Sequence, residues 1–191
     1  MQGTDFRRLS RVFSGWDGYQ TSLIHAIEPL SEDGLGWRPS TNVRSIGEIA
    51  RHIAMGRINW FVRMKAPGSE EAAAKVAWWD ADAHGNRYVR EEDAPIDRDA
   101  GALVEWLKAT WEMVDQTLNA WTVDDLAVTY RHVWRGEVYE ITRQWTVWRI
   151  MAHDIHHGGQ IGRILAERGI DAFELRGLGG HIISPHRAGE V

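Results

Sequence analysis

The most informative segment of this chain reads His153-Asp-Ile-His156-His157-Gly-Gly-Gln160-Ile161, and it lies within a helical pattern over residues 142–169. At about 100° per residue, His153 and His157 lie about 40° apart on one helical face, one turn from each other. Two imidazoles in this arrangement can converge on a single divalent metal ion. His156 lies about 60° to the other side of His153, so its angle makes it a weaker candidate. The spacing predicts part of a metal site on the last long helix.

A third ligand is predicted on an earlier helix, which begins at the capping box Ser45-Ile-Gly-Glu48. We assign Glu48 to helix capping, because its carboxylate can reach back to the Ser45 amide. The apolar stripe of this helix consists of Ile46, Ile49, Ile53, Gly56 and Trp60. His52 lies beside the stripe, from where its ring can reach the interior, although a lone His in such a place is more often a hydrogen-bonded core residue. The candidate ligands are therefore His52, His153 and His157.

Apolar residues at helical spacing predict two further long helices, one over residues 6–30 and one over residues 103–121. Between the last two helices, residues 128–141 alternate at period two around Arg135-Gly136, which is typical of a β-hairpin. We therefore expect an all-α protein, a four-helix bundle with a short β-hairpin before the last long helix.

A length of 191 residues favours a single domain over residues 1–191. Helical spacing is lost over about residues 65–100, apart from one short helix expected within residues 69–78. We interpret this segment as a lid-like insertion. From about residue 170 onward, closely spaced glycines predict an irregular C-terminal tail.

The composition excludes several classes of function. Apolar runs are far shorter than the roughly 18–20 residues of a membrane span, and the N-terminus lacks the features of a signal peptide, so we expect a cytoplasmic protein. Because the net charge is -5 and the sequence lacks a basic block, we expect no nucleic-acid partner. Because the chain has no cysteine, any metal must bind to His, Asp or Glu, and any reactive thiol must come from another molecule.

The sequence gives weaker indications of the roles of other side chains near the histidines. Gln160 and Arg149 lie one turn beyond His156 and one turn before His153, where they can orient a ligand or hold an anionic group. For Arg149, a surface salt bridge is the favoured alternative. A di-iron carboxylate site requires Glu-x-x-His pairs, and the sequence contains none. Three tryptophans of the hairpin and last helix are predicted to lie in the core, namely Trp134, Trp145 and Trp148.

Three motifs together resemble the DinB-like superfamily. Residues 153–161 are similar to its H-E-x-x-H-x-G-Q-I signature, and residues 45–52 with Trp60 resemble its second-helix signature. Leu35-Gly-Trp37-Arg38-Pro39 resembles the L-x-W-R-P segment that precedes that helix. The resemblance covers about residues 6–168, in the order and spacing of the family.

The resemblance implies an up-down-down-up four-helix bundle, commonly dimeric, with a divalent metal on three histidines. Carried over to this chain, the ligands are His52, His153 and His157. Two positions depart from the family pattern, with Asp154 where Glu is frequent and Gly158 where Arg is frequent. Neither change removes a ligand. We expect a homodimer, because the chain also has 11 Trp, more than one bundle of this size needs inside.

The DinB-like superfamily is related to thiol-dependent transferases and to a mycothiol-dependent maleylpyruvate isomerase. The resemblance thus implies a metal-dependent enzyme that transfers a low-molecular-weight thiol, such as mycothiol, bacillithiol or glutathione, to an electrophilic small molecule. Two alternatives stay open, a hydrolase using metal-bound hydroxide and a non-catalytic metal-binding stress-response protein. Zinc and nickel are the favoured metals, with iron and manganese as further candidates.

Overall fold

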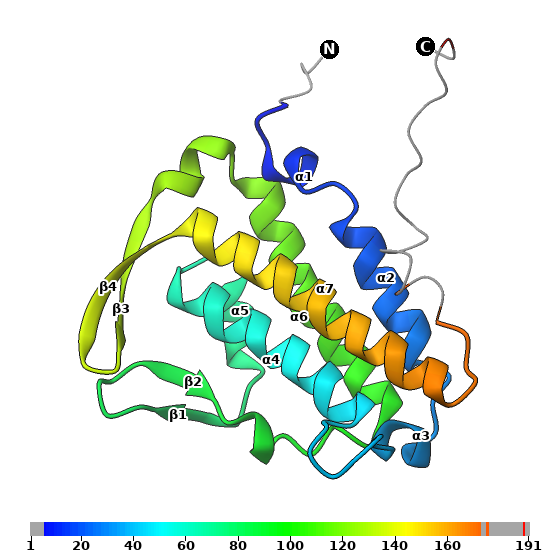
Figure 1. Cartoon of the computed structure of the whole chain (residues 1–191). Helices are drawn as coiled ribbons and strands as arrows, with labels where there is room; N and C mark the ends of the chain where they lie inside the picture. Colours follow the sequence, from blue (N-terminus) through cyan, green and yellow to red (C-terminus); the bar gives the residue numbers. More distant parts are fainter. Residues whose placement is uncertain (1–5, 173–174, 176–188, 190–191) are drawn as a thin grey trace.

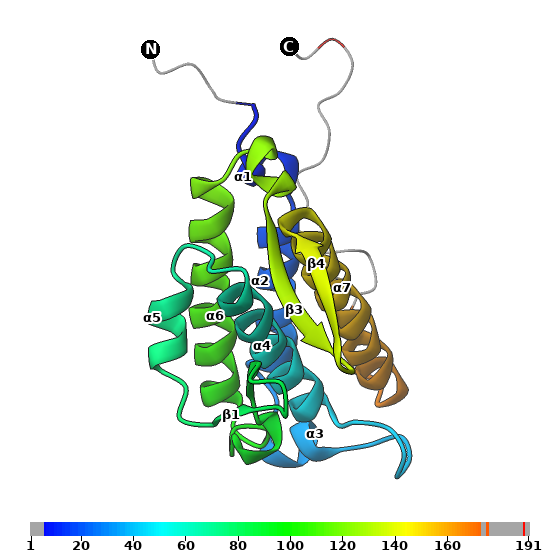
Figure 2. The same cartoon turned by 90° about the vertical axis from the view of Figure 1, so that its left-hand side faces the viewer.

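Four long helices lie side by side in the computed structural model, which describes residues 6–172, 175 and 189 (Figures 1 and 2). They are α2 (Trp16–Ile27), α4 (Ile46–Arg63), α6 (Ala100–Ala120) and α7 (Arg143–Glu167). Helices α4 and α2 each pack against both α6 and α7. The four helices share one core, to which they contribute Leu23, Ile53, Leu107 and Ile161, all fully buried. Within the described residues, no helix combines the length and apolar character needed to cross a membrane.

The two helices that carry the candidate ligands begin at the predicted residues. Ser45 Oγ accepts a hydrogen bond from the Glu48 amide at 3.3 Å, and a Glu48 carboxylate oxygen accepts one from the Ser45 amide at 2.8 Å. Thr142 caps α7, since its hydroxyl accepts a hydrogen bond from the Trp145 amide at 3.1 Å. These caps confirm the predicted starts of α4 and α7.

The predicted continuous helix over residues 6–30 is wrong. Two helices replace it, α1 (Leu9–Val12) and α2, because Gly15 adopts a φ of 102°, a left-handed conformation that interrupts a right-handed helix. A further short helix, α3 (Glu32–Gly36), follows α2 and is capped by the Ser31 side chain.

The insertion over residues 65–100 contains more regular structure than the sequence predicts. The expected short helix is α5 (Ser69–Ala74), and it is followed by an antiparallel strand pair, β1 (Trp79–Ala81) and β2 (Arg87–Val89), and by the 3-10 helix η1 (Glu91–Asp93). Strands of three residues are too short for alternation to be recognised. The protein is mostly helical, as predicted, but it has two small strand pairs where the sequence predicted a single hairpin.

The second strand pair is the predicted hairpin. It consists of β3 (Thr129–Trp134) and β4 (Glu137–Thr142), preceded by the 3-10 helix η2 (Val123–Ala127). Arg135 and Gly136 have φ values of 53° and 84°, as a tight two-residue hairpin turn requires. The Asn86 side chain, in the turn between β1 and β2, donates a hydrogen bond to the Val133 carbonyl at 2.6 Å and so links the two hairpins.

The prediction that Trp134, Trp145 and Trp148 lie in the core is wrong. They are 54%, 43% and 61% exposed. Trp148 lies on the exposed side of α7, Trp145 packs against Trp60 of α4 with 5.3 Å between the ring centroids, and Trp134 lies at the tip of the hairpin. The predicted irregular tail falls almost entirely on residues outside the described part of the chain.

Candidate metal centre

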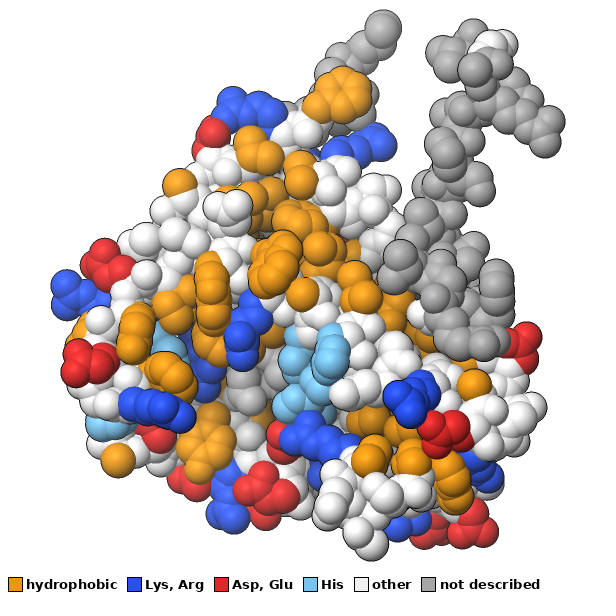
Figure 3. Space-filling model, in the orientation of Figure 1, with side chains coloured by type: hydrophobic (Ala, Val, Ile, Leu, Met, Phe, Trp, Pro, Cys, Tyr) orange, Lys and Arg blue, Asp and Glu red, His pale blue; other side chains and the backbone are white. Residues whose placement is uncertain are grey.

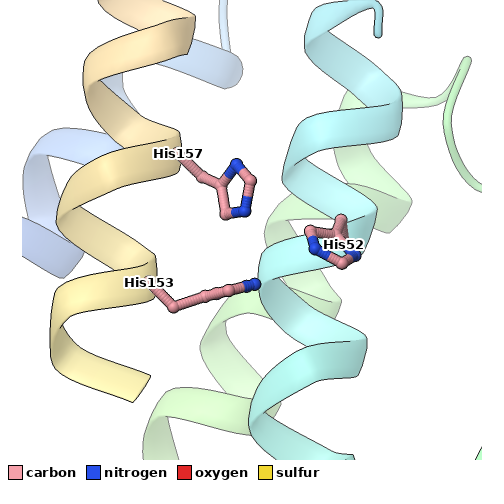
Figure 4. Close-up of side chains that lie close together, drawn as sticks. All are labelled: His52, His153 and His157. Atoms are coloured by element: carbon pink, nitrogen blue, oxygen red, sulfur yellow. The ribbon is translucent and has the colours of Figure 1, made fainter. Parts of the chain in front are cut away.

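Three histidines from two helices meet between α4 and α7 (Figure 4). One ligand atom each from His52, His153 and His157 lies within 4.8 Å of the other two. The ring centroids are 4.4 to 4.8 Å apart, and ring nitrogens face the space between the two helices. The structure therefore brings together the three residues that the sequence selected.

A carboxylate fixes the orientation of the His52 ring through its Nδ1 atom. Its Nδ1 lies 2.9 Å from both carboxylate oxygens of Glu91, in η1. An Nδ1–H that donates to a carboxylate fixes the tautomer in which Nε2 can bind a metal. Burial raises the pKa of Glu91, but the hydrogen bond from His52 and the neighbouring arginine charges lower the pKa more, so it lies below its usual value. Glu91 thus stays ionised, as this role requires.

An amide holds His157 in the same way. The Nδ1 of His157 lies 2.8 Å from Gln160 Oε1, while Gln160 Nε2 lies 3.2 Å from His156 Nε2. Burial lowers the pKa of His157 to about 4, and the neighbouring histidines add to this effect, although the Gln160 contact opposes it. At neutral pH, His157 therefore has the uncharged form that binds metals. His156 is exposed and lies outside the group of three.

The third imidazole, His153, packs closely against α4. A Cβ added at Gly56 would lie 3.1 Å from its ring, so the glycine makes room for the ring beside the helix. Among the described residues, Nδ1 of His153 is buried without a hydrogen-bond partner, and it lies 3.9 Å from Asp154 Oδ1. This nitrogen therefore faces the carboxylate, and Nε2 is the ring nitrogen left to bind an ion.

The donor set fits a divalent metal. Two of the three rings have Nδ1 held by an oxygen acceptor, and Nδ1 of the third lies 3.9 Å from Asp154 Oδ1, so Nε2 of each ring is left for an ion. Zinc binds neutral imidazole nitrogens at about 2.0–2.1 Å. Glu91 was missed by sequence reasoning, because it lies 39 residues from His52 in the insertion and belongs to no motif.

A fully buried ion pair lies next to the three histidines. Arg57 of α4 donates to Asp154 Oδ2 from Nε at 2.9 Å and from Nη2 at 2.7 Å, and both side chains are 0% exposed. Trp16 of α2 donates to the same oxygen at 2.9 Å, and Arg57 Nη1 also contacts the Leu107 carbonyl of α6 at 3.4 Å. The pair therefore connects all four long helices and fixes α7 against α4 beside His153.

The glycine at the second departure from the family pattern has a structural reason. A Cβ added at Gly158 would lie 2.2 Å from the Tyr19 hydroxyl, which itself donates to the Ile155 carbonyl at 3.0 Å. Any side chain at this position would collide with Tyr19. The Tyr19 side chain therefore occupies the space that a side chain at position 158 would need.

The remaining predicted residues lie around the histidines. Glu48 occupies the capping box and also binds Arg38 at 2.5 Å. Arg149 stacks over the rings of Trp60 and Trp145, at 5.2 and 5.0 Å, so the expected surface salt bridge is absent from the described residues. Of the other histidines, His132 packs edge-on against Trp60, and His181 and His186 lie outside the described residues.

The fold and the site together define a class of protein: a mostly helical protein in which two long helices hold three histidines that could bind a metal. A family profile of the DinB superfamily matches residues 16–161, which include all three histidines. The chain belongs to the DinB superfamily.

One solved structure shows the same fold. It is the crystal structure of a DinB-like protein from Bacillus cereus ATCC 10987, with a TM-score of 0.57 and 14% sequence identity, and the match covers 87% of this chain and 97% of that chain. A comparison with curated proteins finds no match.

Proposed function

We propose that His52, His153 and His157 bind one divalent metal ion, and that the protein is a metal-dependent enzyme which transfers a low-molecular-weight thiol to an electrophilic small molecule. The observation that carries the proposal is the convergence of three imidazoles, two of them oriented by oxygen acceptors. Imidazole binds several divalent metals, with zinc and nickel the favoured ions and iron and manganese as alternatives.

The residues of the site favour chemistry over a purely structural role. Three protein ligands are typical of catalytic zinc, whereas structural zinc has four. When bound, a divalent ion supplies Lewis acidity, which lowers the pKa of a thiol or of water. Glu91 and Gln160 hold two ligand rings in place, and the three rings are themselves half-buried. Because the chain has no cysteine, the reacting sulfur has to come from a small thiol.

Metal analysis of protein without a His tag tests the site. We expect His52→Ala, His153→Ala and His157→Ala each to lose stoichiometric metal. His156→Ala is the matched control, because His156 is exposed on the same helix, and we expect it to keep most of the metal. Full metal content in the His157→Ala protein would refute the ligand assignment.

Cobalt substitution tests the reaction class. Adding mycothiol, bacillithiol or glutathione to the cobalt-loaded protein should produce a cobalt–sulfur charge-transfer band that is absent from His153→Ala. A spectrum that responds to carboxylate or phosphate analogues but not to thiols would favour hydrolysis over thiol transfer as the reaction class. A spectrum that responds to neither would favour a non-catalytic metal-binding protein, as in a stress response.

The remaining expectations are proposals about organisation. We propose a single domain over residues 1–191 with helices in the up-down-down-up order, working in the cytoplasm as a homodimer. Exposed apolar side chains of the hairpin and α7 support an interface with a second copy, since Val138 and Trp148 are 62% and 61% exposed.

A further inference from the structure

A pocket of about 750 Å³ lies beside the candidate metal centre, between the two hairpins and the helices α4 and α7. Its walls include Trp60 of α4 and Trp145 of α7, with Tyr88 from β2 and Tyr139 from β4. The hydrogen bond from Asn86 to Val133 joins the hairpins at this place. Both strand pairs therefore help to form one pocket with aromatic walls.

Two arginines line this pocket beside the same indole ring. The guanidinium groups of Arg63 and Arg149 lie 4.8 and 5.2 Å from the ring centroid of Trp60. Among the residues that the structure describes, neither group forms an ion pair, and Nε of Arg63 is buried without a hydrogen-bond partner. In contrast, the buried Arg57 is paired with Asp154.

The electrostatics of the pocket favour an anion. Burial lowers the pKa of Arg63, and the positive charge of Arg149 lowers it further, although Tyr130 and Asp82 oppose the shift. Two like charges beside one indole ring repel each other, and an anion placed between them would relieve the repulsion.

The acidic residues of the pocket are engaged elsewhere. Asp82 accepts hydrogen bonds from the Asn86 side chain at 2.7 Å and from the backbone amides of its own turn. Glu140 pairs across the hairpin with Arg131 at 3.9 Å. Asp82 still raises the pKa of Arg63 through its charge, but among the described residues neither carboxylate forms an ion pair with Arg63 or Arg149, so both guanidinium groups can bind an external anion.

The position of the pocket relates it to the three histidines. Arg149 lies one helical turn before His153 on α7, and Trp60 lies one turn after Gly56, the glycine that makes room for the His153 ring. One turn corresponds to about 5.4 Å along a helix axis. On this face of the molecule, basic side chains lie next to the group of histidines (Figure 3). A ligand held by the arginines can thus extend toward the metal centre.

We propose that this pocket binds a small aromatic carboxylate, with its carboxylate between Arg63 and Arg149 and its ring against Trp60 and Trp145. A planar carboxylate matches the fork of guanidinium donors, and aromatic walls favour a flat apolar body. The proposal that such a ligand binds depends only on the residues of the pocket. Its identity as the electrophilic substrate rests on the proposed function, since that step requires the metal centre.

Calorimetric titration of the full-length protein tests the proposal, both as purified and after treatment with a chelator. The probes are 2-naphthoate, the neutral 2-naphthamide and inorganic phosphate. We expect 2-naphthoate to bind both forms of the protein, and the amide to bind at least about tenfold more weakly, because it lacks the charge-assisted hydrogen bonds. Phosphate, which lacks a ring, should bind at least about tenfold more weakly as well.

Arg63→Gln and Arg149→Gln should each weaken 2-naphthoate binding by about tenfold or more. Arg163→Gln is the matched control, because it removes the same charge from an exposed position of α7 outside the pocket, and it should change the affinity by less than about twofold. Arg149 is exposed, so its variant tests the site without a change in the core. Thermal melting of each variant shows that it is folded.

Four outcomes would overturn the proposal. They are no binding of 2-naphthoate, equal binding of the amide, equal binding of phosphate, and binding that disappears with the metal but survives both arginine substitutions. The last outcome would place the carboxylate on the metal itself. If the protein holds no metal and 2-naphthoate still binds through the arginines, the proposed function fails while the pocket assignment stands.

Discussion

Removal of the buried carboxylate of Asp154 is the most direct test of how the four helices are held together. Asp154→Ala leaves Arg57 fully buried without its ion-pair partner and removes the acceptor of the Trp16 indole. Breaking a buried ion pair from one side costs about 3–5 kcal/mol, because the remaining charge is uncompensated. This is a large part of the roughly 5–15 kcal/mol that stabilises a typical domain.

A matched control exists on the same helix. Arg163 and Glu167 of α7 form an ion pair at 3.1 Å, but the Arg163 side chain is 82% exposed. Glu167→Ala should therefore change the free energy of unfolding by less than about 1 kcal/mol. The comparison separates the effect of burial from the effect of removing a carboxylate from α7.

Denaturant unfolding followed by circular dichroism measures both variants, in the presence of a chelator so that metal binding does not alter the apparent stability. For a chain of this size, a loss of about 3–5 kcal/mol corresponds to a decrease in Tm of about 6–20 °C. Replacing both partners, with Arg57→Met and Asp154→Leu together, should cost less than Asp154→Ala alone, because no charge is left buried. An Asp154→Ala protein as stable as Glu167→Ala would refute the reasoning.

Three further predictions follow from other contacts. Gly158→Ala should destabilise the protein by about 1–3 kcal/mol in denaturant unfolding, because its Cβ would collide with Tyr19, and an unchanged stability would contradict the close contact. The pKa of Glu48 lies below its usual value, since hydrogen bonds from the Ser45 amide and Arg38 outweigh the opposing effect of burial. A depressed carboxyl pKa contributes stability above the ordinary pKa of about 4.5, and this contribution is lost as the pH falls through the lower folded-state value. Unfolding measured over this acidic range should therefore show a smaller pH dependence in Glu48→Gln than in wild type, and equal slopes would count against the role of Glu48. Trp148→Ser should shift the protein toward monomer in sedimentation velocity, and a wild-type monomer would remove the basis for the proposed dimer.

The sequence identified the features that depend on local geometry. The period of an α-helix places His153 and His157 on one face wherever the helix packs, and the capping box at Ser45 fixes the start of α4 through contacts within three residues. The tight hairpin turn at Arg135-Gly136 is equally local. These predictions hold because neighbours in the chain supply all the groups involved.

Some predictions failed because the deciding contacts are not periodic. The interruption at Gly15 follows from one left-handed residue within an otherwise helical pattern, and the strands β1 and β2 are too short for a repeat to be recognised. The exposure of Trp148 was mispredicted, since apolar spacing does not reveal which side of a helix the rest of the chain covers.

Only the tertiary structure determined the surroundings of the three histidines. Glu91 reaches His52 across 39 residues, Arg57 reaches Asp154 across 97, and Trp16 reaches Asp154 across 138. No local pattern selects these partners, because a carboxylate in a loop or an arginine within a helix has the same sequence signature whether it is exposed or buried. Packing of the helices removes these groups from water, and the cost of leaving them unpaired then determines which partners they adopt.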